Sequence, residues 1–325
     1  MYKTIIVGFG KIGGQNITDK MTRKSYRYSN HFQAIQRSKK FKLSAIVDTS
    51  KKARDFAKNK CQVDCVFSSV KDAEKKNGPF DLMVLCTPPL NRINLIRSMK
   101  NIKGIIMEKP VSLNLNESRT ILNFCQKNKI ACEVNYWRRF IPELQRNKNL
   151  FLKKCIGSLQ SIIVCYCGGI KNNGVHLLDF IRYLCGDLIR LESSRRSKIF
   201  KSGVFEDDYD FSFYGSLNGS IPIFGVPLKK RFFRENSIEF LGSRGKLSFV
   251  NDGRLLFRNL TRVHRGLDDN KELNYENNYN ISINYDLAIP YLYNHMEKVL
   301  RKQKSEISSL SNALKNELLI NNLLK

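Results

Sequence analysis

The stretch that decides the fold of this chain is Tyr2-Lys3-Thr4-Ile5-Ile6-Val7-Gly8-Phe9-Gly10-Lys11-Ile12-Gly13. A mostly apolar run over residues 3–8 predicts a strand, and a helix-compatible segment extends from Lys11 to about Thr22. Between them lies GxGxxG, where the missing side chains let backbone amides approach a pyrophosphate at a helix N-terminus. Small residues in any tight turn can match this pattern, so the flanking strand and helix carry the prediction. We therefore expect a dinucleotide site formed by Gly8, Phe9, Gly10, Lys11, Ile12 and Gly13.

The second predicted strand, residues 42–47, ends at Asp48. A carboxylate at this strand end can accept hydrogen bonds from the adenosine ribose, which favours NAD over NADP. Asp48 lies 35 residues after Gly13, and the usual separation is about 20. An additional segment, residues 23–40, accounts for the difference, and its His31–Ile35 portion predicts a short second helix. A solvated strand-end Asp is the alternative, and tolerance for the ribose phosphate of NADP comes from Lys51, Lys52 and Arg54.

Length and composition predict a folded chain of two domains. The chain has 325 residues, of which 42% are hydrophobic and 26% charged, as in ordinary globular proteins. Its apolar runs are shorter than the roughly 20 residues of a membrane-spanning helix, and its first apolar stretch is too short for a signal peptide. We therefore expect no membrane span and a cytoplasmic protein. Nine cysteines without paired spacing predict reduced thiols and no metal site.

The net charge of +27 raises the hypothesis of a nucleic-acid partner. Lysines and arginines are spread over the whole length, with no basic tail and no recognisable nucleic-acid module. This distribution favours a solvated basic surface, so we do not expect nucleic acid as a partner. Attraction of a phosphorylated substrate is compatible with either interpretation.

The first part of the chain alternates strand-like and helix-like segments. Apolar runs follow at residues 65–67, 82–86, 105–107 and 131–135, separated by polar segments with helical character. Such alternation predicts a parallel sheet. We therefore expect a Rossmann domain over residues 1–136, with a doubly wound parallel sheet.

The pattern of predicted helices and strands changes after Tyr136. A helical stretch near Phe140 precedes a strand at 159–167 and a helix at 175–185. Antiparallel strands are predicted at 210–214, 237–241, 246–250 and 254–258. Two helices close the chain, at 287–302 and 308–324, the second capped by Ser308. Residues 137–325 thus predict an α+β domain with a large, open, mostly antiparallel sheet, whose C-terminal helices can pack back toward the first domain.

Several short motifs follow the glycine turn in a defined order. Cys86-Thr87-Pro88-Pro89 ends the fourth strand, Glu108-Lys109-Pro110 follows the fifth, and Arg138-Arg139-Phe140 comes after the sixth. A Gly168-Gly169 to Gly186-Asp187 helix region and a Gly242-x-x-Gly245 turn continue the series. By the order and spacing of these motifs over nearly its whole length, the chain resembles the Gfo/Idh/MocA oxidoreductases.

The resemblance implies a cofactor cleft lined by Cys86, Thr87, Pro88 and Pro89, with Glu108 and Lys109 beside the nicotinamide. Moving a hydride from a sugar carbon requires removal of the hydroxyl proton and stabilisation of the developing oxyanion. Lys109 is expected to polarise that oxygen. The alternative is an exposed loop lysine, which its place between Glu108 and Pro110 disfavours.

The resemblance also names His176 as the principal acid–base residue, because imidazole titrates near neutrality. A structural histidine is the alternative. The family usually carries Asp four residues earlier, where this chain has Asn172. Asn172 can hydrogen-bond the sugar or the imidazole but cannot raise the basicity of the imidazole as a carboxylate would. Asp179 is a further candidate for orienting His176, although packing is the more usual role of that position.

Three residues after the sixth strand complete the expected site. Arg138 and Arg139 are expected to face the cleft, where guanidinium groups suit sugar hydroxyls or a phosphate. Trp137 is equally compatible with stacking on a sugar or nicotinamide and with a place in the core. The predicted substrate-binding residues are therefore Lys109, Trp137, Arg138, Arg139, Asn172 and His176, with Lys109, His176 and Asn172 as the catalytic set.

The resemblance as a whole implies an NAD(P)-dependent sugar dehydrogenase of carbohydrate metabolism. The expected substrate is a secondary hydroxyl or ketone of a sugar, including a nucleotide-linked sugar of surface polysaccharide biosynthesis, and the expected assembly is a homodimer or homotetramer. A cofactor-binding regulator with little or no turnover is the competing hypothesis, suggested by Asn172 and the charge. Reduction of a non-sugar carbonyl or imine is a third, which fold alone does not exclude.

Overall fold

The computed structural model describes residues 1–18, 20, 24, 27–146, 150–187, 189–193, 200–201 and 208–324. The chain divides into two compact units, and each is considered by itself. The first comprises residues 1–140 and 286–315, and the second comprises residues 141–285 and 316–325. The predicted domain boundary after residue 136 stays a prediction. In the described part of the chain, every helix is too short or too polar to cross a membrane.

A six-stranded parallel sheet forms the centre of the first unit. Its strand order is β3-β2-β1-β4-β5-β6, and each neighbouring pair is parallel. This is the doubly wound Rossmann arrangement, in which the order reverses between β1 and β4, so the predicted fold class is confirmed. The strands are β1 (Tyr2–Val7), β2 (Phe41–Val47), β3 (Val66–Phe67), β4 (Leu82–Leu85), β5 (Gly104–Met107) and β6 (Ala131–Val134).

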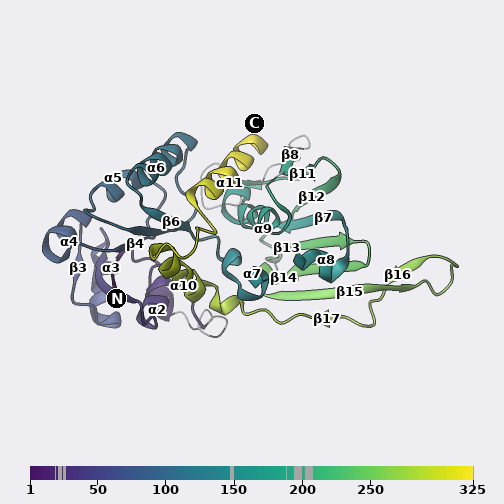
Figure 1. The fold of residues 1–325 in the computed structure, drawn as a ribbon, viewed down its shortest axis with the longest axis horizontal. Helices are drawn as coiled ribbons and strands as arrows, with labels where there is room; N and C mark the ends of the chain where they lie inside the picture. Colours follow the sequence, from purple (N-terminus) through teal and green to yellow (C-terminus); the bar gives the residue numbers. More distant parts are fainter. Residues whose placement is uncertain are drawn as a thin grey trace. The chain divides into compact units, whose positions relative to one another are not determined.

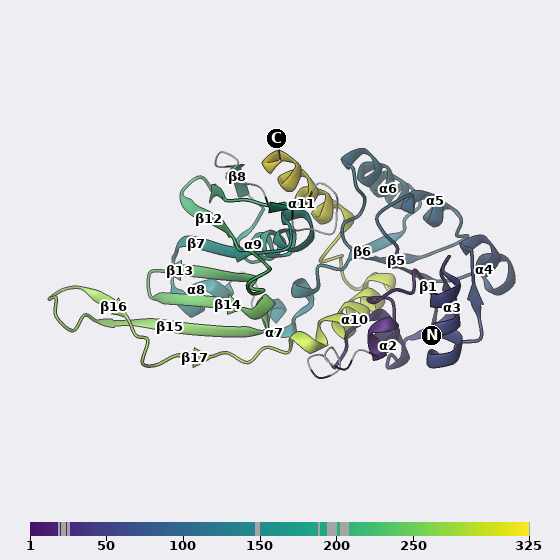
Figure 2. The same ribbon diagram turned by 180° about the vertical axis from the view of Figure 1, so that it is seen from behind.

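Helices cover both faces of this sheet. Figures 1 and 2 show α5 and α6 on one side and α2, α3 and α10 on the other. Four helices begin after residues whose side chains accept a hydrogen bond from the first turn, Asn30, Ser50, Ser69 and Asn114, which satisfies an otherwise unpaired N–H. The helices are α2 (His31–Gln36), α3 (Lys51–Cys61), α4 (Val70–Asn77), α5 (Arg92–Arg97), α6 (Leu115–Lys127) and α10 (Ala288–Leu300), with 3₁₀ turns η1 (Gln15–Thr18) and η2 (Trp137–Phe140).

The helix predicted from Lys11 to Thr22 is wrong. A turn at residues 11–14 leads into η1, and positions 19 and 21–22 lie outside the described residues. The predicted short helix near His31 is confirmed as α2. It packs against the glycine turn, where the helix from Lys11 to Thr22 was expected. The His31 N–H donates to the Ile12 carbonyl at 3.0 Å, and the next N–H donates to the Gly13 carbonyl at 3.1 Å. The additional residues are thus inserted between Gly13 and Asn30, and the Asn30 side chain caps α2.

A mixed sheet dominates the second unit, in the order β16-β15-β14-β13-β7-β12-β11-β8 with β17 paired to β15. Of its described pairs, β7–β12 is parallel and the others are antiparallel, which confirms the predicted character of this sheet. The strands are β7 (Leu159–Tyr166), β8 (Ile189–Ser193), β11 (Phe213–Leu217), β12 (Ile221–Pro227), β13 (Ser237–Gly242), β14 (Gly245–Val250), β15 (Leu255–Val263), β16 (Lys271–Leu273) and β17 (Tyr279–Asn280).

Two predictions for this unit need correction. The strand expected at 210–214 is divided between β10 (Tyr209–Asp210), which pairs with β9 (Phe200–Lys201), and β11. The strand β12 was not predicted, because its apolar residues are interrupted by Pro222 and Gly225, which usually mark breaks in a strand. Pro222 is accommodated near the beginning of β12, where the strand pairs with β11.

The helices of the second unit pack on one face of its sheet. In this unit α8 (Phe151–Ile156) and α9 (Val175–Cys185) lie in front of the sheet in Figure 1 and behind it in Figure 2. Phe249 of β14 is the centre of this packing, because its ring contacts the rings of Phe180 at 4.8 Å and Phe240 at 5.9 Å. The remaining helical segments are α7 (Pro142–Arg146), the π-helical turn η4 (Ile170–Gly174), and the 3₁₀ turns η5 (Asn251–Gly253) and η6 (Tyr285–Leu287).

The last helix, α11 (Leu310–Leu323), begins in the first unit and ends in the second. Ser309 caps it, since the Ser309 hydroxyl accepts the Asn312 N–H at 3.3 Å. The predicted cap, Ser308, is wrong by one residue. Ser308 is buried, and its backbone N–H donates to the Glu133 carboxylate at 2.7 Å.

Candidate active site

The glycine turn lies between β1 and the inserted segment, and each glycine of the motif has a distinct environment. Gly8 has φ +91°, and a Cβ there would lie 2.7 Å from the backbone of Cys86 and Thr87. A Cβ on Gly13 would lie 2.3 Å from the Gly8 carbonyl oxygen, whereas a Cβ on Gly10 would meet nothing within 4 Å. Gly8 and Gly13 are therefore required by close backbone packing, and Gly10 leaves open space over the turn. This is the division of roles expected of a pyrophosphate-binding turn.

Asp48 lies beside this turn, at the end of β2. Its Oδ2 accepts the Phe9 N–H at 2.6 Å, and its Oδ1 accepts the Ser50 N–H at 2.8 Å. Each carboxylate oxygen has a second lone pair, so both can accept another donor such as a ribose hydroxyl. Arg54 donates to the backbone carbonyls of Asp48 and Thr49, both at 2.8 Å. The Arg54 guanidinium thus holds the strand end in place.

A buried arginine joins the two motifs that follow β4 and β5. Arg92 is 1% exposed, and its guanidinium donates to the carbonyls of Glu108 and Pro110, both at 2.5 Å, and to that of Val111 at 3.3 Å. It also donates to the Thr87 carbonyl. One side chain from α5 therefore fixes the backbone on both sides of Lys109 and ties it to the end of β4. Sequence reasoning missed this residue.

The Glu108 side chain is held by a group of buried polar residues. Its Oε1 accepts from His31 Nε2 at 3.0 Å and from Asn135 Nδ2 at 2.6 Å. His31 Nδ1 lies 2.9 Å from the hydroxyl of Tyr293 on α10. Burial by itself raises the pKa of the Glu108 carboxyl, but the hydrogen bond and charge of His31, together with Asn135 and Lys109, outweigh it and leave that pKa below its usual range. Glu108 is therefore a carboxylate at neutral pH.

Lys109 is half-buried and adjoins this carboxylate. The Lys109–Pro110 peptide bond is cis. The charge of Lys109 contributes to the lowered pKa of Glu108, so the ammonium group and the carboxylate influence each other. With its backbone fixed by Arg92, Lys109 has the defined position that a polarising group needs.

Two buried polar atoms at the same sheet edge lack partners among the described residues. They are the Thr87 hydroxyl, after β4, and the Asn135 side-chain carbonyl, after β6. Such atoms are usually satisfied in native proteins, so they suggest a ligand or water at this edge. Cys86 lies beside them, and burial, followed by the charge of Glu108, raises the pKa of its thiol well above the usual range. The Cys86 thiol is therefore neutral and is not a nucleophile.

In the second unit, the turn that precedes α9 is fixed by two buried aspartates. Asp210 accepts the N–H groups of Gly168 at 3.2 Å and Gly169 at 2.8 Å. Asp208 accepts those of Lys171 at 2.8 Å and Asn172 at 3.1 Å. Burial is the main reason that the pKa of Asp208 rises to about 6, and the neighbouring Asp210 adds to the rise against the two backbone hydrogen bonds. Both aspartates were missed from the sequence.

This turn carries the predicted catalytic residues of the second unit. Asn172 is half-buried in η4, and its Nδ2 lies 3.5 Å from the Gly168 carbonyl. His176 is half-buried at the second position of α9. Asp179, the candidate for orienting His176, is 1% exposed and accepts a hydrogen bond from Asn316 at 2.6 Å. That contact favours the packing role for Asp179.

The three predicted residues of η2 have unequal environments. Arg139 is 4% exposed and donates to the Ile307 carbonyl at 3.0 Å, and its expected place facing the cleft stays a prediction. Arg138 is 5% exposed, with its guanidinium 4.3 Å from the centre of the Trp137 ring. Trp137 itself is half-buried. One face of the indole is thus covered by Arg138, in a cation–π contact.

The structure therefore groups the predicted residues in two sets. The first unit holds the glycine turn, Asp48, the residues after β4 and β5, and η2, and the second holds Asn172 and His176. Among the described residues, no three His, Cys, Asp or Glu side chains are grouped so as to hold a metal ion. The residues missed from the sequence are buried polar groups, for which a single sequence carries no signal: His31, Arg92, Asn135, Asp208, Asp210 and Tyr293.

Comparison with known proteins gives one family match. Residues 2–136 match the Gfo/Idh/MocA oxidoreductase family, described by its NAD-binding Rossmann fold. The rhizopine catabolism protein MocA of Rhizobium meliloti is 26% identical over 125 residues, which cover 34% of this chain and 39% of that protein. Inositol 2-dehydrogenase of Rhizobium meliloti (strain 1021) is 23% identical over 241 residues, which cover 68% of this chain and 72% of that enzyme.

A solved structure extends the likeness over the whole chain. The WlbA dehydrogenase from Bordetella pertussis, in complex with NADH and UDP-GlcNAcA, aligns with a TM-score of 0.69 and 16% identity. The alignment covers 99% of this chain and 95% of WlbA. At this identity the likeness shows that both chains share the same two-part fold.

Proposed function

Since residues 2–136 match the NAD-binding Rossmann fold of the Gfo/Idh/MocA oxidoreductases, we propose that the chain is an NAD(P)-dependent dehydrogenase of this family, acting on a secondary hydroxyl, or the corresponding ketone, of a sugar. One observation carries this proposal. The glycine turn, with open space at Gly10, and the Glu108–Lys109 turn, fixed by Arg92, lie at the same edge of the sheet. The carboxyl edge of a doubly wound sheet, where the strand order reverses, is where such folds bind nucleotides.

The residues present fit a nicotinamide dinucleotide. The space at Gly10 suits a pyrophosphate, and Asp48 has spare acceptor capacity for a ribose, which favours NAD over NADP. Lys51 and Lys52 are exposed at the start of α3, so NADP is the second candidate. Among the described residues, the Thr87 hydroxyl, which adjoins Cys86, Pro88 and Pro89 in the sequence, and the Asn135 side-chain carbonyl lack partners and can hydrogen-bond a ligand. When bound, the nicotinamide supplies the hydride chemistry.

The proposed roles of the protein groups follow from their chemistry. Lys109 donates a hydrogen bond to the reacting oxygen and stabilises negative charge on it. His176 takes the hydroxyl proton during oxidation and returns it during reduction. Asn172 hydrogen-bonds the sugar, because an amide cannot serve as a base at neutral pH. Trp137 and Arg138 are proposed to contact the substrate, and Arg139 supports them from the interior.

For the substrate we propose a sugar, with a nucleotide-linked sugar of surface polysaccharide biosynthesis as the sharper hypothesis. Inositol 2-dehydrogenase supports a polyhydroxylated ring, and WlbA was solved with a nucleotide-linked sugar. The net charge of +27 favours an anionic substrate through long-range attraction. The nine free cysteines suit the reducing cytoplasm, which is the proposed location.

We propose that the subunits of a homodimer or homotetramer meet at the face of the second unit's sheet that lies opposite α8 and α9. On β12, Ile223 is buried toward the helices, whereas Phe224 and Val226 are 48% and 42% exposed on the other face. Tyr214 of β11 pairs with Phe224 and is 46% exposed, so the apolar area continues across strands. In Figure 2 this face carries no helix of the described chain. An exposed apolar area of this kind commonly marks an association surface.

The test is turnover by the purified protein on a panel of free and nucleotide-linked sugars, with NAD and NADP. Oxidation or reduction that is lost in Lys109→Met and in His176→Asn would support the proposal. NADH binding without turnover of any sugar, together with nucleic-acid binding that weakens steeply with salt, would support the regulator hypothesis instead. Light scattering of the wild type and of Phe224→Lys tests the assembly, and an unchanged mass would argue against this contact.

A further inference from the structure

We propose that His31 is a positioning residue that fixes the Glu108 carboxylate relative to the glycine turn, and so couples the pyrophosphate end of the cofactor site to its nicotinamide end. This inference rests on the proposed function, because it assigns His31 to the same site. His31 lies in α2, far in sequence from both motifs, and no feature of the sequence pattern distinguishes it from a core residue.

The imidazole of His31 has both nitrogens engaged. Nε2 lies 3.0 Å from Glu108 Oε1, and Nδ1 lies 2.9 Å from the Tyr293 hydroxyl. An ionised Glu108 can only accept, so Nε2 carries the proton that it donates. Nδ1 then accepts the Tyr293 hydroxyl proton if the ring is neutral, and donates to the Tyr293 oxygen if the ring is protonated, so the contact holds the ring in either state. The chain of hydrogen bonds therefore runs from Tyr293 through His31 to Glu108 and determines where Oε1 lies.

The backbone of His31 is anchored to the glycine turn. Its N–H donates to the Ile12 carbonyl at 3.0 Å. The preceding residue, Asn30, is fully buried and caps α2 by accepting the Gln33 N–H at 2.9 Å. The Phe32 ring packs edge-on against Phe9, with centroids 5.8 Å apart. The same residue thus contacts the pyrophosphate turn through its backbone and Glu108 through its side chain.

Burial along the hydrogen-bonded chain shows which end faces a ligand. Tyr293 is 1% exposed and His31 is 0% exposed, whereas the Glu108 side chain is 14% exposed. The Tyr293 ring packs against Phe41 with centroids 5.5 Å apart. The Tyr293 end of this hydrogen-bonded series is shielded from solvent, so the series cannot carry a proton through to solvent at that end. Its accessible end is the carboxylate, which identifies the role as positioning and not proton transfer.

The first unit contains a matched control. His295 of α10 is 6% exposed, and its Nε2 lies 3.2 Å from Oε1 of the fully buried Glu133. That pair is a buried imidazole–carboxylate contact like His31–Glu108, but Glu133 also accepts the N–H groups of Ile307 and Ser308 and supports the chain before α11. His295→Asn therefore removes a comparable contact without touching Glu108.

The experiment measures the affinity of the full chain for NADH and for ADP-ribose, which lacks the nicotinamide. His31→Asn keeps a polar group toward Tyr293 but does not reach Glu108, and it should weaken NADH binding about tenfold, as expected for one lost charged hydrogen bond. ADP-ribose affinity should change less than about threefold, since the glycine turn and Asp48 are intact. His31→Gln, whose amide N–H can reach Glu108, should restore most of the NADH affinity. His295→Asn should lower the melting temperature and change neither affinity.

Each outcome has a single meaning. If wild type binds neither NADH nor ADP-ribose, the proposed function fails and this inference with it. If wild type binds both, and His31→Asn weakens both equally or neither, the proposed function stands and His31 is only a packing residue. A His31→Gln variant no better than His31→Asn would likewise overturn the positioning role.

Discussion

Glu108 at the carboxyl edge of the parallel sheet and Asp208 beside the turn before α9 are both largely withdrawn from solvent, yet their pKa values move in opposite directions. Burial raises the pKa of each. For Glu108 the imidazole of His31, the Asn135 amide and the Lys109 charge reverse that effect. For Asp208 the backbone hydrogen bonds are too weak to do so, and Asp210 adds a like charge.

The comparison shows that a buried carboxylate is defined by its partners more than by its burial. Side chains that donate to Glu108 keep it ionised and fixed next to Lys109, as a charged site near a cofactor requires. Backbone N–H groups alone leave Asp208 with a pKa of about 6, so its ionised form is costly near neutral pH. The first arrangement is built to present charge, and the second to fix a turn.

The largest expected effect comes from replacing Arg92, whose guanidinium donates to the backbone carbonyls on both sides of Lys109. Arg92→Met leaves four buried or partly buried carbonyls without this donor, and we expect it to lower the free energy of unfolding of the first unit by on the order of 4 kcal/mol. Urea denaturation followed by circular dichroism measures this. Arg97→Met on the same helix is the control, because Arg97 is exposed and packs on the Phe124 ring. A comparable loss in both variants would mean that Arg92 contributes only packing.

Glu108→Gln should have the next largest effect, with a distinctive dependence on pH. Both hydrogen bonds to Oε1 survive, but they lose charge, so we expect a cost of about 2 kcal/mol at pH 7. Because the folded pKa of Glu108 is lowered, the stability it contributes is fully present above its unfolded pKa and is lost as pH falls through the folded value. The difference between wild type and variant should therefore shrink on acidification. Urea unfolding from pH 7 down to the acid limit of the fold measures it, and a constant difference would contradict an ionised Glu108.

Asp208→Asn should show the opposite trend. The folded pKa of about 6 lies above the unfolded one, so Asp208 gives up stability as pH rises between them, on the order of 2–3 kcal/mol by pH 7. The variant loses one backbone hydrogen bond, at a cost of about 1 kcal/mol, but at pH 7 it avoids the larger cost of the buried charge and should be at least as stable as the wild type. At pH 4.5, where wild-type Asp208 is protonated, the variant should be the less stable of the two. If the stability of the variant relative to the wild type does not fall between pH 7 and pH 4.5, Asp208 is ionised throughout and the contrast with Glu108 disappears.

The sequence predicted the parts of the site that depend on local backbone pattern. The glycine turn, Asp48 and the parallel sheet follow from strand–turn–helix periodicity, and the turn and Asp48 lie at the strand ends where that pattern places them. The predicted helix after Gly13 was wrong because additional residues separate the glycine turn from the helix α2. The spacing of apolar residues alone does not show where such an insertion lies. The bounds of α9 were predicted correctly, since an uninterrupted apolar pattern ends at Gly186.

The sequence could not predict the groups that fix the site. Arg92 and His31 contact Glu108, and Asp208 contacts Lys171 and Asn172, over separations of 16 to 77 positions along the chain. Their residue types are ones that usually lie at the surface or in structural roles. Arg139 was predicted from its charge to face the cleft, and nothing in the sequence indicated its burial or its hydrogen bond to the Ile307 carbonyl.

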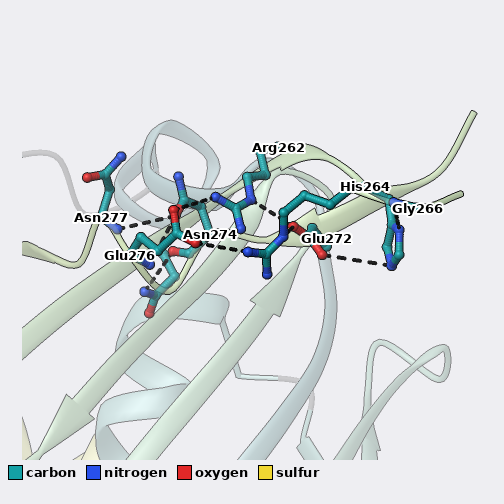
Figure 3. A network of polar contacts seen from close by, with 9 residues as sticks. Arg262, His264, Gly266, Glu272, Asn274, Glu276 and Asn277 are labelled. Carbon is teal, nitrogen blue, oxygen red and sulfur yellow. Dashed lines mark hydrogen bonds and ion pairs between the residues drawn. The ribbon is translucent and has the colours of Figure 1, made fainter. Parts of the chain in front are cut away.

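The smallest expected effect concerns carboxylates that share an arginine at the surface. Figure 3 shows Arg262 of β15 beside Glu272 and Glu276, with Nε donating to Glu272 at 2.7 Å and Nη1 to Glu276 at 2.8 Å. Hydrogen bonds from Arg262 are the main cause that lowers the pKa of Glu276 and of Glu272. The direction matches that of Glu108, but these ion pairs lie at the surface, where solvent screens the charges, so little free energy depends on them.

Arg262→Gln should therefore shift the melting temperature by only about 2 °C or less in low salt, because solvent screens exposed ion pairs. Arg265 also contacts both carboxylates, at 2.9 and 3.0 Å, and can replace part of the lost interaction. In 1 M salt the shift should vanish, since the Debye length falls to about 3 Å. Differential scanning calorimetry at the two salt concentrations measures this. A large shift that persists in high salt would show that lowered pKa values alone mark stabilising carboxylates, and that the distinction drawn between Glu108 and the surface pair is wrong.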